Sequence, residues 1–385
     1  MLLKKLCSFS KGLQVKRDLT STNYDIPYLH YGDLYKKYNV NLKLNEKYNE
    51  IIKVNRDCYD IRYQIDNNNI VMNLTSENYD DLGKCVIVKN SENKPFIAGM
   101  ETHLIKIHSQ LIIPEYLNYY FESRNFLKTI QQFITGMKVF RVKPDDILNI
   151  DITLPNLQWQ QHIVDIIGSI DEKIENNNKL IDKLYEYLDL QMKKLAYHKE
   201  KIQICTNDEI SIANSGIDKF VGEKIYLDTS SVIGNSIIDN SYKVSYNNRP
   251  SRANMAPQDN TVWIAKLKNS PKHIIVKSYC DDLKNKYIFS TGFLGIKISK
   301  ELFNLLSIYF ISETFEKEKD NLSVGATMQS INNATFKNMY IPKFKDNDYI
   351  QFNKISENIF KLIYKLYIEK NKLYKLKNTY LAKFF

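Results

Sequence analysis

The fold of this chain can be predicted from one stretch, residues 155–200, which reads PNLQWQQHIVDIIGSIDEKIENNNKLIDKLYEYLDLQMKKLAYHKE. Apolar residues recur along this stretch at spacings of three and four, the heptad pattern of a coiled-coil seam. The seam residues are Ile163, Ile167, Ile170, Ile174, Ile181, Leu184, Leu188 and Leu195. Asn177 and Gln191 occupy two core positions of the same register. The pattern predicts one long helix over residues 155–200.

A second heptad stretch lies within residues 343–385. The predicted seam residues are Ile355, Ile359, Leu362, Leu366, Leu373, Leu376 and Tyr380. Glu369 takes the slot that Asn177 has in the first stretch. At 1.5 Å per residue each helix would reach about 50–60 Å, which is longer than a small domain is wide. Each helix therefore needs a long partner, and we expect the two to form an antiparallel coiled coil whose polar core residues fix the register.

The segments that precede the two helices also repeat, in the same order and about 190 positions apart. Tyr28-Leu29 corresponds to Tyr226-Leu227, and Gly136 corresponds to Gly325. The other matched segments are 67–72 with 258–263, 95–99 with 288–292, 120–121 with 309–310, and 145–152 with 334–341. A shared order with a nearly constant offset indicates a duplicated module.

Each copy of the module reads as a mixed domain followed by a long helix. Short β-type runs occur at residues 70–72, 86–88, 104–107, 262–265 and 295–298. One further helix is expected near residues 115–134 and another near 300–319. We therefore predict an α+β fold: two tandem mixed α/β domains, separated by two long helices that form an antiparallel coiled coil with pseudo-two-fold symmetry.

The composition permits a polyanionic partner without demanding one. Lys and Arg number 54 against 44 Asp and Glu, a net charge of +10 over 385 residues. An AT-rich genome would also produce a chain rich in Lys, Asn, Ile and Tyr. The five cysteines are scattered without metal-ligand spacing, as is typical of reduced thiols. No apolar run reaches the ~18 residues that span a bilayer, and the start does not resemble a signal peptide. We expect a soluble, cytoplasmic chain without a metal site.

The sequence contains no catalytic signature that withstands scrutiny. It has no GxxxxGK loop for ATP, no Asn-Pro-Pro-aromatic tetrapeptide of amino-methyltransferases and no glycine cluster that could cradle S-adenosylmethionine. Residues 171–173, Asp-Glu-Lys, resemble a nuclease set, but they lie on the heptad helix, where solvated charge is expected. His103, His108 and His273 have no convergent partners in the sequence, so surface or satisfied core roles are expected. We predict a non-enzymatic chain.

The chain resembles the specificity (S) subunit of type I restriction-modification enzymes over essentially its whole length. The most specific part is residues 154–163, LPNLQWQQHI, followed by residues 170–174, IDEKI, before and within the spacer helix. Trp159 replaces the family's usual Glu before Gln160. The second copy, at residues 341–345, lacks the Glu-Gln pair. Residues 10–13, 26–35, 215–216 and 226–228 are similar to the starts of the family's target recognition domains.

This resemblance implies a division of the chain into four parts. They are a first target recognition domain (1–154), a central spacer helix (155–200), a second target recognition domain (201–342) and a C-terminal spacer helix (343–385). Each recognition domain would read one half of a bipartite DNA target, and helix length would set the gap. Two methyltransferase (M) subunits and restriction/translocase (R) subunits would be the partners. S-adenosylmethionine, ATP and Mg²⁺ would belong to those partners and not to this chain.

Candidate DNA-contacting residues follow from side-chain chemistry. Arg, Gln and Asn read base edges through paired hydrogen bonds, whereas Lys mainly neutralises phosphate. Residues 135–143 place cations around a glycine, and the corresponding residues 323–330 offer hydroxyls and an amide. The candidates are Lys36, Lys37, Lys138, Arg141, Lys143, Arg249, Arg252, Thr327 and Gln329.

Three other functions stay open at this point. The chain could be the specificity subunit of a related bifunctional restriction-methylation system, which a neighbouring gene would reveal. It could be a coiled-coil interaction protein with no role on nucleic acid, in which case it would lack salt-dependent duplex binding. A stand-alone enzyme conflicts with the absent motifs.

Overall fold

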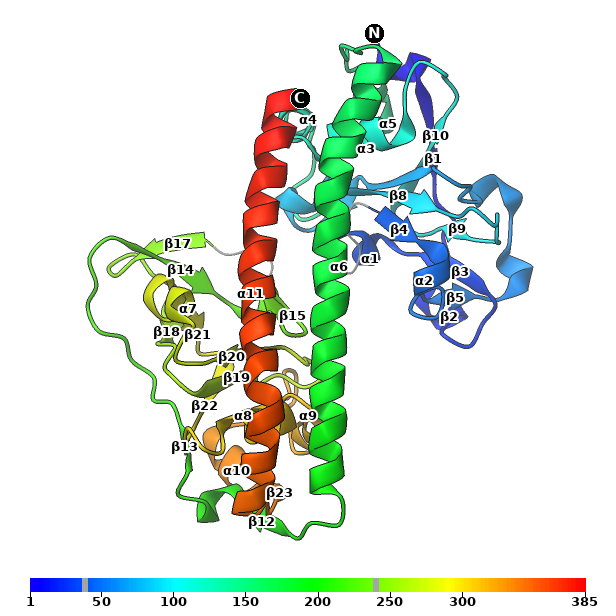
Figure 1. Cartoon of the computed structure of the whole chain (residues 1–385). Coiled ribbons are helices and arrows are strands. Elements are labelled where there is room, and N and C mark those ends of the chain that lie inside the picture. Colours follow the sequence, from blue (N-terminus) through cyan, green and yellow to red (C-terminus); the bar gives the residue numbers. More distant parts are fainter. Residues whose placement is uncertain (37–40, 238–241) are drawn as a thin grey trace. The chain divides into compact units, whose positions relative to one another are not determined.

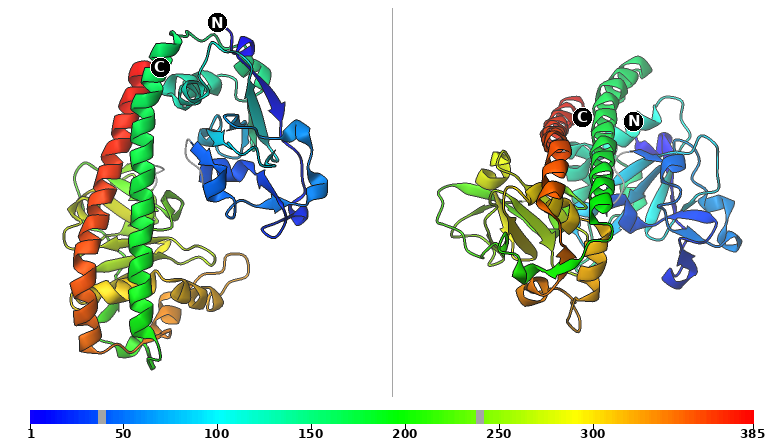
Figure 2. Two further views of the ribbon diagram at one scale, coloured as in Figure 1. Left: turned by 45° about the vertical axis from the view of Figure 1, so that its right-hand side comes forward. Right: turned by 60° about the horizontal axis from the view of Figure 1, so that its bottom comes forward.

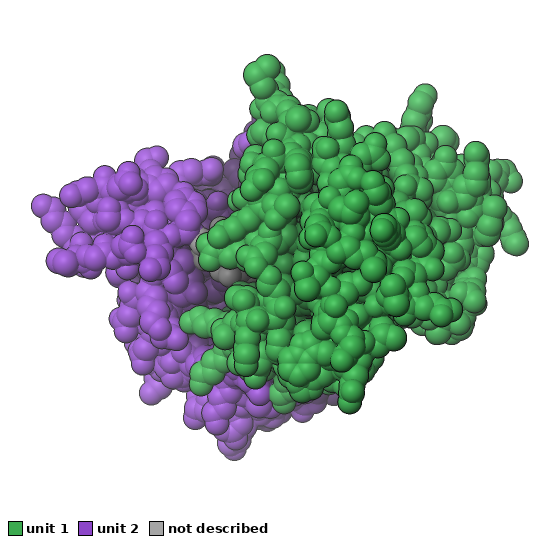
Figure 3. Space-filling view, turned by 90° about the horizontal axis from the view of Figure 1, so that it is seen from above, with its two compact units in different colours: residues 1–176, 370–385 green, residues 177–369 purple. Residues whose placement is uncertain are grey.

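The fold was analysed in a computed structural model that describes residues 1–36, 41–237 and 242–385. The chain forms two compact units, which Figure 3 shows in two colours. Unit 1 comprises residues 1–176 and 370–385, and unit 2 comprises residues 177–369. Each unit contains a mixed α/β domain and one segment of each of two long helices (Figure 1). The mixed fold class with two long helices is confirmed. The predicted four-part division stays a prediction, because the units divide each long helix between them.

The two long helices are α6 (Leu157–Ala196) and α11 (Asp346–Phe384). Asn156 caps the start of α6, where its Oδ1 accepts the N–H of Trp159 at 2.8 Å. At the start of α11 the carboxylate of Asp348 accepts the N–H of Lys345 at 2.7 Å. α6 begins two residues after Pro155, and α11 begins four residues after Pro342. These are the prolines that precede the two helices in the sequence repeat.

Within each unit the segments of α6 and α11 run antiparallel (Figure 2). In unit 2, Asn177 donates to Glu369 at 2.9 Å, and further along, Lys199 pairs with Asp348 at 2.7 Å. In unit 1, Lys377 pairs with Asp171 at 2.9 Å, and Leu381 belongs to the same apolar core as Ile163. The contact of Asn177 with Glu369 joins the two residues that the heptad register placed in equivalent slots.

The predicted seam of α11 is wrong at three positions. Ile355, Leu362 and Leu376 are 39%, 40% and 43% exposed. The residues of α11 that are buried are Tyr349, Phe352, Ser356, Phe360, Ile363, Leu366, Lys370, Lys377 and Leu381. Several of these are polar, so an apolar heptad search passes over them and selects the neighbouring exposed residues instead.

The domain of unit 1 contains two main sheets. The first has the order β1-β10-β6-β8-β4, with all neighbours antiparallel except β4 and β8. The second has the order β2-β5-β3-β9, in which β3 and β9 are parallel. The strands are β1 (Cys7–Lys11), β2 (Thr20–Ser21), β3 (Ile26–Leu29), β4 (Asn41–Lys43), β5 (Lys53–Val54), β6 (Ile70–Asn73), β7 (Thr75–Ser76), β8 (Cys85–Lys89), β9 (Ile97–Ala98), β10 (Thr102–Ile107) and β11 (Phe140–Arg141). The short helices are α1 (Tyr31–Lys36), α2 (Leu44–Lys47), α3 (Pro114–Glu122), α4 (Arg124–Gln131) and α5 (Pro144–Leu148).

The domain of unit 2 repeats most of this topology, with one strand fewer in its first sheet. Its first sheet has the order β13-β22-β19-β20 and its second the order β17-β14-β21-β18, in which β14 and β21 are parallel. The strands are β12 (Lys201–Gln203), β13 (Ile210–Ile212), β14 (Glu223–Leu227), β15 (Val232–Ile233), β16 (Ser236–Ile237), β17 (Tyr242–Ser245), β18 (Ala253–Met255), β19 (Thr261–Ala265), β20 (His273–Val276), β21 (Tyr287–Ser290), β22 (Phe293–Ile298) and β23 (Tyr340–Pro342). The short helices are α7 (Asp281–Lys286), α8 (Phe303–Phe310), α9 (Glu313–Asn321) and α10 (Asn333–Lys337).

The parallel strand pairs carry the sequence repeat. Tyr28 is paired with Ile97 in unit 1, and Tyr226 is paired with Ile288 in unit 2. These residues belong to the segments that the sequence matched, and they lie in the parallel strand pair of the second sheet in each unit. The duplication is therefore visible in the pairing of these strands, although the register is shifted by two residues, since Ile97 corresponds to Ser290 in the sequence match.

Where one helix was predicted before each candidate loop, each unit has two. Ser123 separates α3 from α4 and caps α4, since its Oγ accepts the N–H of Phe126 at 3.2 Å. Ser312 does the same between α8 and α9, where it accepts the N–H of Phe315 at 3.3 Å. A serine cap in mid-segment starts a new helix without a proline or glycine to signal the break.

Candidate nucleic-acid interface

Each unit carries a short loop that is closed by two backbone hydrogen bonds. In unit 1, Thr135 and Arg141 exchange bonds of 2.9 and 2.8 Å around residues 136–140. In unit 2, Val324 and Ser330 exchange bonds of 3.1 and 3.0 Å around residues 325–329. The two segments, loop 136–140 and loop 325–329, therefore have the same length and the same closure.

Both loops depend on the glycine at their first position. Gly136 has φ +109° and Gly325 has φ +133°, values that residues with a Cβ rarely adopt. A Cβ on Gly136 would also lie 2.1 Å from the carbonyl oxygen of Val139, and one on Gly325 would lie 2.6 Å from that of Met328. The repeat of glycine in the sequence thus has a conformational cause.

Each loop is attached to the segment that follows an inner strand of the first sheet. After β6 in unit 1, the carbonyl of Leu74 accepts the N–H of Val142 at 3.0 Å. After β19 in unit 2, the carbonyl of Lys266 accepts the N–H of Ile331 at 3.0 Å. The same loop thus lies at the same edge of each domain, so the two domains present corresponding surfaces.

In unit 1 the loop and its flank are cationic. Lys138, Arg141 and Lys143 are all exposed, and no ion pair joins any of them to an acidic residue among those that the structure describes. Met137, at the loop's tip, is 96% exposed. Such cations can contact phosphate, and Arg141 can also read a base edge through two parallel hydrogen bonds.

In unit 2 the loop is polar but carries no charge. Thr327 and Gln329 are exposed, and the backbone carbonyl of Gln329 accepts the N–H of Lys268 at 2.9 Å. The side chains of both residues can exchange hydrogen bonds with base edges. The nearest cations come from neighbouring segments and not from the loop itself.

The two candidate arginines of unit 2 differ in their surroundings. Arg249 donates from Nε to the carbonyl of Ala253 at 3.1 Å and from Nη1 to that of Tyr246 at 2.5 Å. Its guanidinium also lies 4.2 Å from the centre of the Tyr246 ring, so the side chain braces its own turn. Arg252 is exposed, and its backbone carbonyl accepts the N–H of Thr291 at 2.8 Å. Of the two, Arg252 has more of its donors available to a ligand.

The two candidate lysines near the N-terminus receive no structural test. Lys36 is the last residue of α1, and Lys37 lies outside the described residues.

Lys266 is a neighbour of loop 325–329 that the sequence analysis did not select. The sequence indicates this residue only weakly: Lys266 is a cation that directly follows the buried strand β19, where the other copy of the module has the apolar Leu74. Strand-end cations of this kind are common, and only the attachment of the loop gives this one a place in the interface.

The residues that resembled catalytic groups have structural roles. Asp171, expected to be solvated, instead lies in a largely buried cluster, where it accepts from the Tyr119 hydroxyl at 3.0 Å and from Lys377. Burial raises the pKa of the neighbouring Glu122 to about 7, although Lys377 opposes this shift. Burial, aided by Lys11, lowers the pKa of His103 to about 4.

His273 is a satisfied core histidine, as expected. Its Nε2 lies 2.9 Å from a carboxylate oxygen of Glu316, and its Nδ1 lies 3.1 Å from the amide oxygen of Asn235. Across the described ranges, His, Cys, Asp and Glu do not gather in any group of three or more suited to a metal ion. Nor does any described helix have the length and apolarity needed to cross a bilayer.

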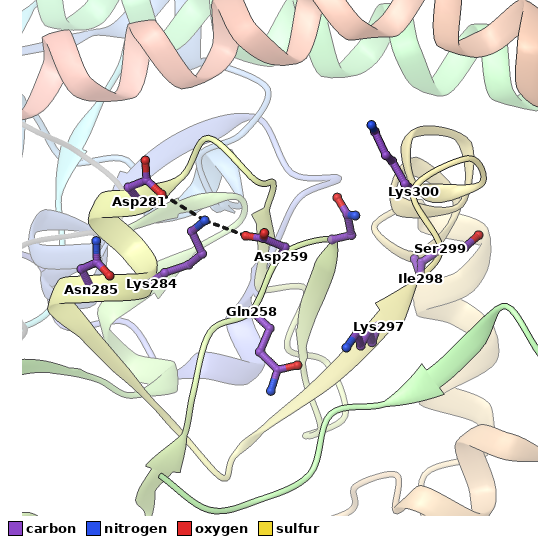
Figure 4. A pocket seen from close by; sticks show the side chains of 10 residues that line it. Gln258, Asp259, Asp281, Lys284, Asn285, Lys297, Ile298, Ser299 and Lys300 are labelled. Carbon is purple, nitrogen blue, oxygen red and sulfur yellow. Dashed lines mark hydrogen bonds and ion pairs between the residues drawn. The ribbon is translucent and has the colours of Figure 1, made fainter. Parts of the chain in front are cut away.

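A surface depression of about 580 Å³ lies elsewhere in unit 2 (Figure 4). Its lining includes Gln258, Asp259, Asp281, Lys284, Lys297 and Lys300. Figure 4 shows Lys284 directed between two carboxylates, and its Nζ lies 2.6 Å from Asp259 and 3.0 Å from Asp281. The hydrogen bond that Lys284 donates to Asp259 is the main cause of the raised pKa of Lys284. Much of the charge in this depression is therefore paired internally, and we assign it no ligand.

Comparison with known proteins found a match to a family model in the first half of the chain. Residues 1–186 match the family model described as "Type I restriction modification DNA specificity domain". A comparison with curated proteins found no match.

Three solved structures are similar along the whole length of this chain. The first is a type I restriction-modification S subunit from M. genitalium, with 14% sequence identity and a TM-score of 0.48; the match covers 100% of this chain and 95% of that one. The second comes from work on complex assembly and conformational transition of the type I R-M system, with 13% identity, a TM-score of 0.38 and coverage of 100% of this chain and 96% of that one. The third is the HsdS subunit from Thermoanaerobacter tengcongensis, with 13% identity, a TM-score of 0.32 and coverage of 100% of this chain and 95% of that one. The family match covers residues 1–186, so this part of the chain is similar to the type I restriction-modification DNA specificity domain.

Proposed function

We propose that this chain is the DNA sequence-specificity subunit of a type I restriction-modification system and that each unit reads one half of a bipartite target. The observation that carries the proposal is the repeated interface. Loop 136–140 and loop 325–329 have the same closure, the same glycine and the same attachment, but different side chains. Equivalent scaffolds with different reading residues suit two half-sites of different sequence.

The long helices are proposed to link the two reading domains and to fix the gap between half-sites. The polar contact of the buried Asn177 with the half-buried Glu369 supports this role, because a polar pair in a helix seam fixes register more than it adds stability. A fixed register is what a spacer of defined length requires.

The chain is proposed to act without chemistry of its own, in the cytoplasm. Methylation and cleavage would belong to two methyltransferase subunits and to restriction/translocase subunits, which would carry S-adenosylmethionine, ATP and Mg²⁺. The buried roles of Asp171 and His273 support a chain whose titratable residues serve the fold.

The test is methylome sequencing of a host with and without this gene, together with methylation assays on the purified subunits. We expect a gapped, two-part motif to lose its methylation when the gene is deleted. The purified chain alone should transfer no methyl groups, and the methyltransferase subunits should become sequence-selective when it is added. Methyl transfer by the chain alone, or an unchanged methylome, would contradict the proposal.

A further inference from the structure

Two cations of unit 2 meet at the turn between β21 and β22, beside loop 325–329. Lys266 donates from Nζ to the carbonyl of Thr291 at 3.0 Å. Arg252 is bound to the same residue through its backbone, since its carbonyl accepts the N–H of Thr291 at 2.8 Å. The Lys266 side chain is half-buried and Arg252 is exposed, so one cation is fixed and the other reaches solvent.

A glycine leaves space next to these cations. A Cβ on Gly292 would lie 3.2 Å from Cγ2 of Thr229 and 3.8 Å from Nη2 of Arg252. The guanidinium of Arg252 therefore lies over the same turn whose carbonyl holds Lys266. The absence of a side chain at residue 292 keeps the approach to this turn open.

No acidic side chain forms an ion pair with Lys266 or Arg252 in the part of the chain that the structure describes. Burial, and then the positive charge of Arg252, lower the pKa of Lys266. Two like charges held close together repel each other, and an anion bound between them would relieve that repulsion. The arrangement thus favours a negatively charged ligand.

A buried polar cluster holds the segment that presents Lys266. Lys319 is fully buried and donates to the carbonyls of Ala265 and Ser270, each at 3.3 Å, on either side of the β19–β20 turn. Its Nζ also pairs with Glu316 at 2.5 Å, and Glu316 in turn contacts His273. The turn is therefore fixed at both ends, and Lys266 does not need to be ordered when a ligand binds.

Unit 1 distributes its charge in another way. The backbone position that Lys266 occupies in unit 2 is taken in unit 1 by Leu74, which is completely buried. Instead, loop 136–140 and its flank carry Lys138 and Arg141 themselves. Each unit thus places cations next to its loop, but unit 2 takes them from segments beside β18 and β19 and leaves its loop neutral.

We infer that Lys266 and Arg252 form a binding site for a backbone phosphate of the DNA that unit 2 recognises. This inference rests on the proposed function, because the phosphate is that of the recognised duplex. The backbone N–H of Lys268, two residues after Lys266, donates to the carbonyl of Gln329. The site therefore adjoins the loop that is proposed to read bases. A phosphate held here would position the duplex while Thr327 and Gln329 contact base edges.

The test measures binding of the full chain to a random-sequence duplex over a range of salt concentrations. The double variant Lys266→Gln/Arg252→Gln should reduce the slope of log K against log salt by about 1, the value for one lost phosphate contact. The control Lys297→Gln/Lys300→Gln removes the same charge from exposed lysines of the depression in Figure 4 and should keep the wild-type slope. Lys266→Arg keeps the positive charge and should therefore also keep the wild-type slope.

An unchanged slope in the double variant, or an equal loss in the control, would overturn the phosphate site while the proposed function stands. A wild-type chain that binds duplex without any salt dependence would overturn both. A measurement without variants guards against misfolding: acetylation of Lys266 in the wild-type chain should fall several-fold when duplex is added. Equal acetylation with and without duplex would also reject the site.

Discussion

Lys377 is a cation of α11 that lies buried between two acids of unit 1. Its Nζ is 2.8 Å from Glu122 and 2.9 Å from Asp171, and the side chain is 7% exposed. Burial alone would lower its pKa, but these two carboxylates outweigh burial and raise it. The cluster fastens the end of α11 to the domain and to α6, so its loss should be felt by the whole of unit 1.

We predict that Lys377→Met destabilises the chain by about 3–5 kcal/mol, the usual cost of breaking a buried pair from one side. The loss should be greater at pH 8 than at pH 5. The pKa of Glu122, about 7, is above its unfolded value, so its contribution to stability is complete at low pH and falls as the pH rises through 7. Without Lys377 that pKa would rise further, and the penalty at pH 8 would grow.

Thermal melting at the two pH values measures this effect. Lys365→Met, on an exposed position of the same helix, removes the same charge and is the control. Equal melting temperatures for Lys377→Met and the control at pH 8 would contradict the structural role of the cluster.

Arg141 is an exposed cation whose backbone closes loop 136–140. We predict that Arg141→Ala weakens recognition of one half-site only, by about 1–3 kcal/mol if its guanidinium pairs with a base. The backbone bonds to Thr135 do not depend on the side chain, so the loop should keep its shape. Methylation of targets mutated in one half at a time measures the loss, with Lys128→Ala, on the exposed side of α4, as the control. Equal loss at both half-sites would remove Arg141 from the first interface.

At the scale of the element, two glycines should respond to the same substitution in opposite directions. Gly136→Ala forces a Cβ against the Val139 carbonyl at a positive φ, which should cost about 1–3 kcal/mol and distort the loop. Gly168→Ala lies within α6 and would meet only the Tyr119 hydroxyl at 3.6 Å, so it should gain about 0.5–1 kcal/mol. Urea denaturation of both variants measures the difference. A stabilised Gly136→Ala would show that the loop has another conformation.

The outward side of α11 in unit 2 is a separate prediction. Ile355 and Leu362 are one heptad apart and about 40% exposed, so they lie on one face that no residue of the seam covers. We predict that Leu362→Arg weakens binding of the methyltransferase subunits by roughly tenfold or more without lowering the melting temperature. Lys354→Arg, exposed on the same helix, is the control. Unchanged co-purification of the partner would exclude this face from the interface.

Helix α11 also shows which buried positions could not be predicted from the sequence. The seam of α6 could be predicted because nearly every core position is Ile or Leu, from Ile163 to Leu188. In α11 the core positions include two polar residues, Ser356 and Lys377, and Lys377 is buried because Glu122 and Asp171 pair with it. A period search sees no such partners, and it therefore selected the exposed Leu362 and Leu376.

For the molecule as a whole, the duplication could be predicted and the charged interface only in part. Buried strand residues such as Tyr28 and Tyr226 keep their identity in both copies because each is enclosed by the same sheet. Lys266 follows β19 and Arg252 precedes β18, and their meeting at Thr291 depends on the pairing of β19 with β22 and of β18 with β21. Tertiary contacts of this kind leave no local pattern in the sequence.

The last prediction concerns the spacer helix α6 and the gap between the two half-sites of the DNA target. α6 is one uninterrupted helix that begins in unit 1 and ends in unit 2, so its length is a property that both units share. Inserting four residues after Asn178 adds about 6 Å to a helix, close to two base-pair steps of about 3.4 Å. We therefore expect the gap in the methylated motif to change by about two base pairs while the bases of both half-sites stay the same. Methylome sequencing reads both properties at once. The control is the same insertion at residues 197–200, beyond the end of α6, which should leave the gap as it is. Altered bases with an unchanged gap would show that the helix orients the reading loops and does not measure the distance between half-sites.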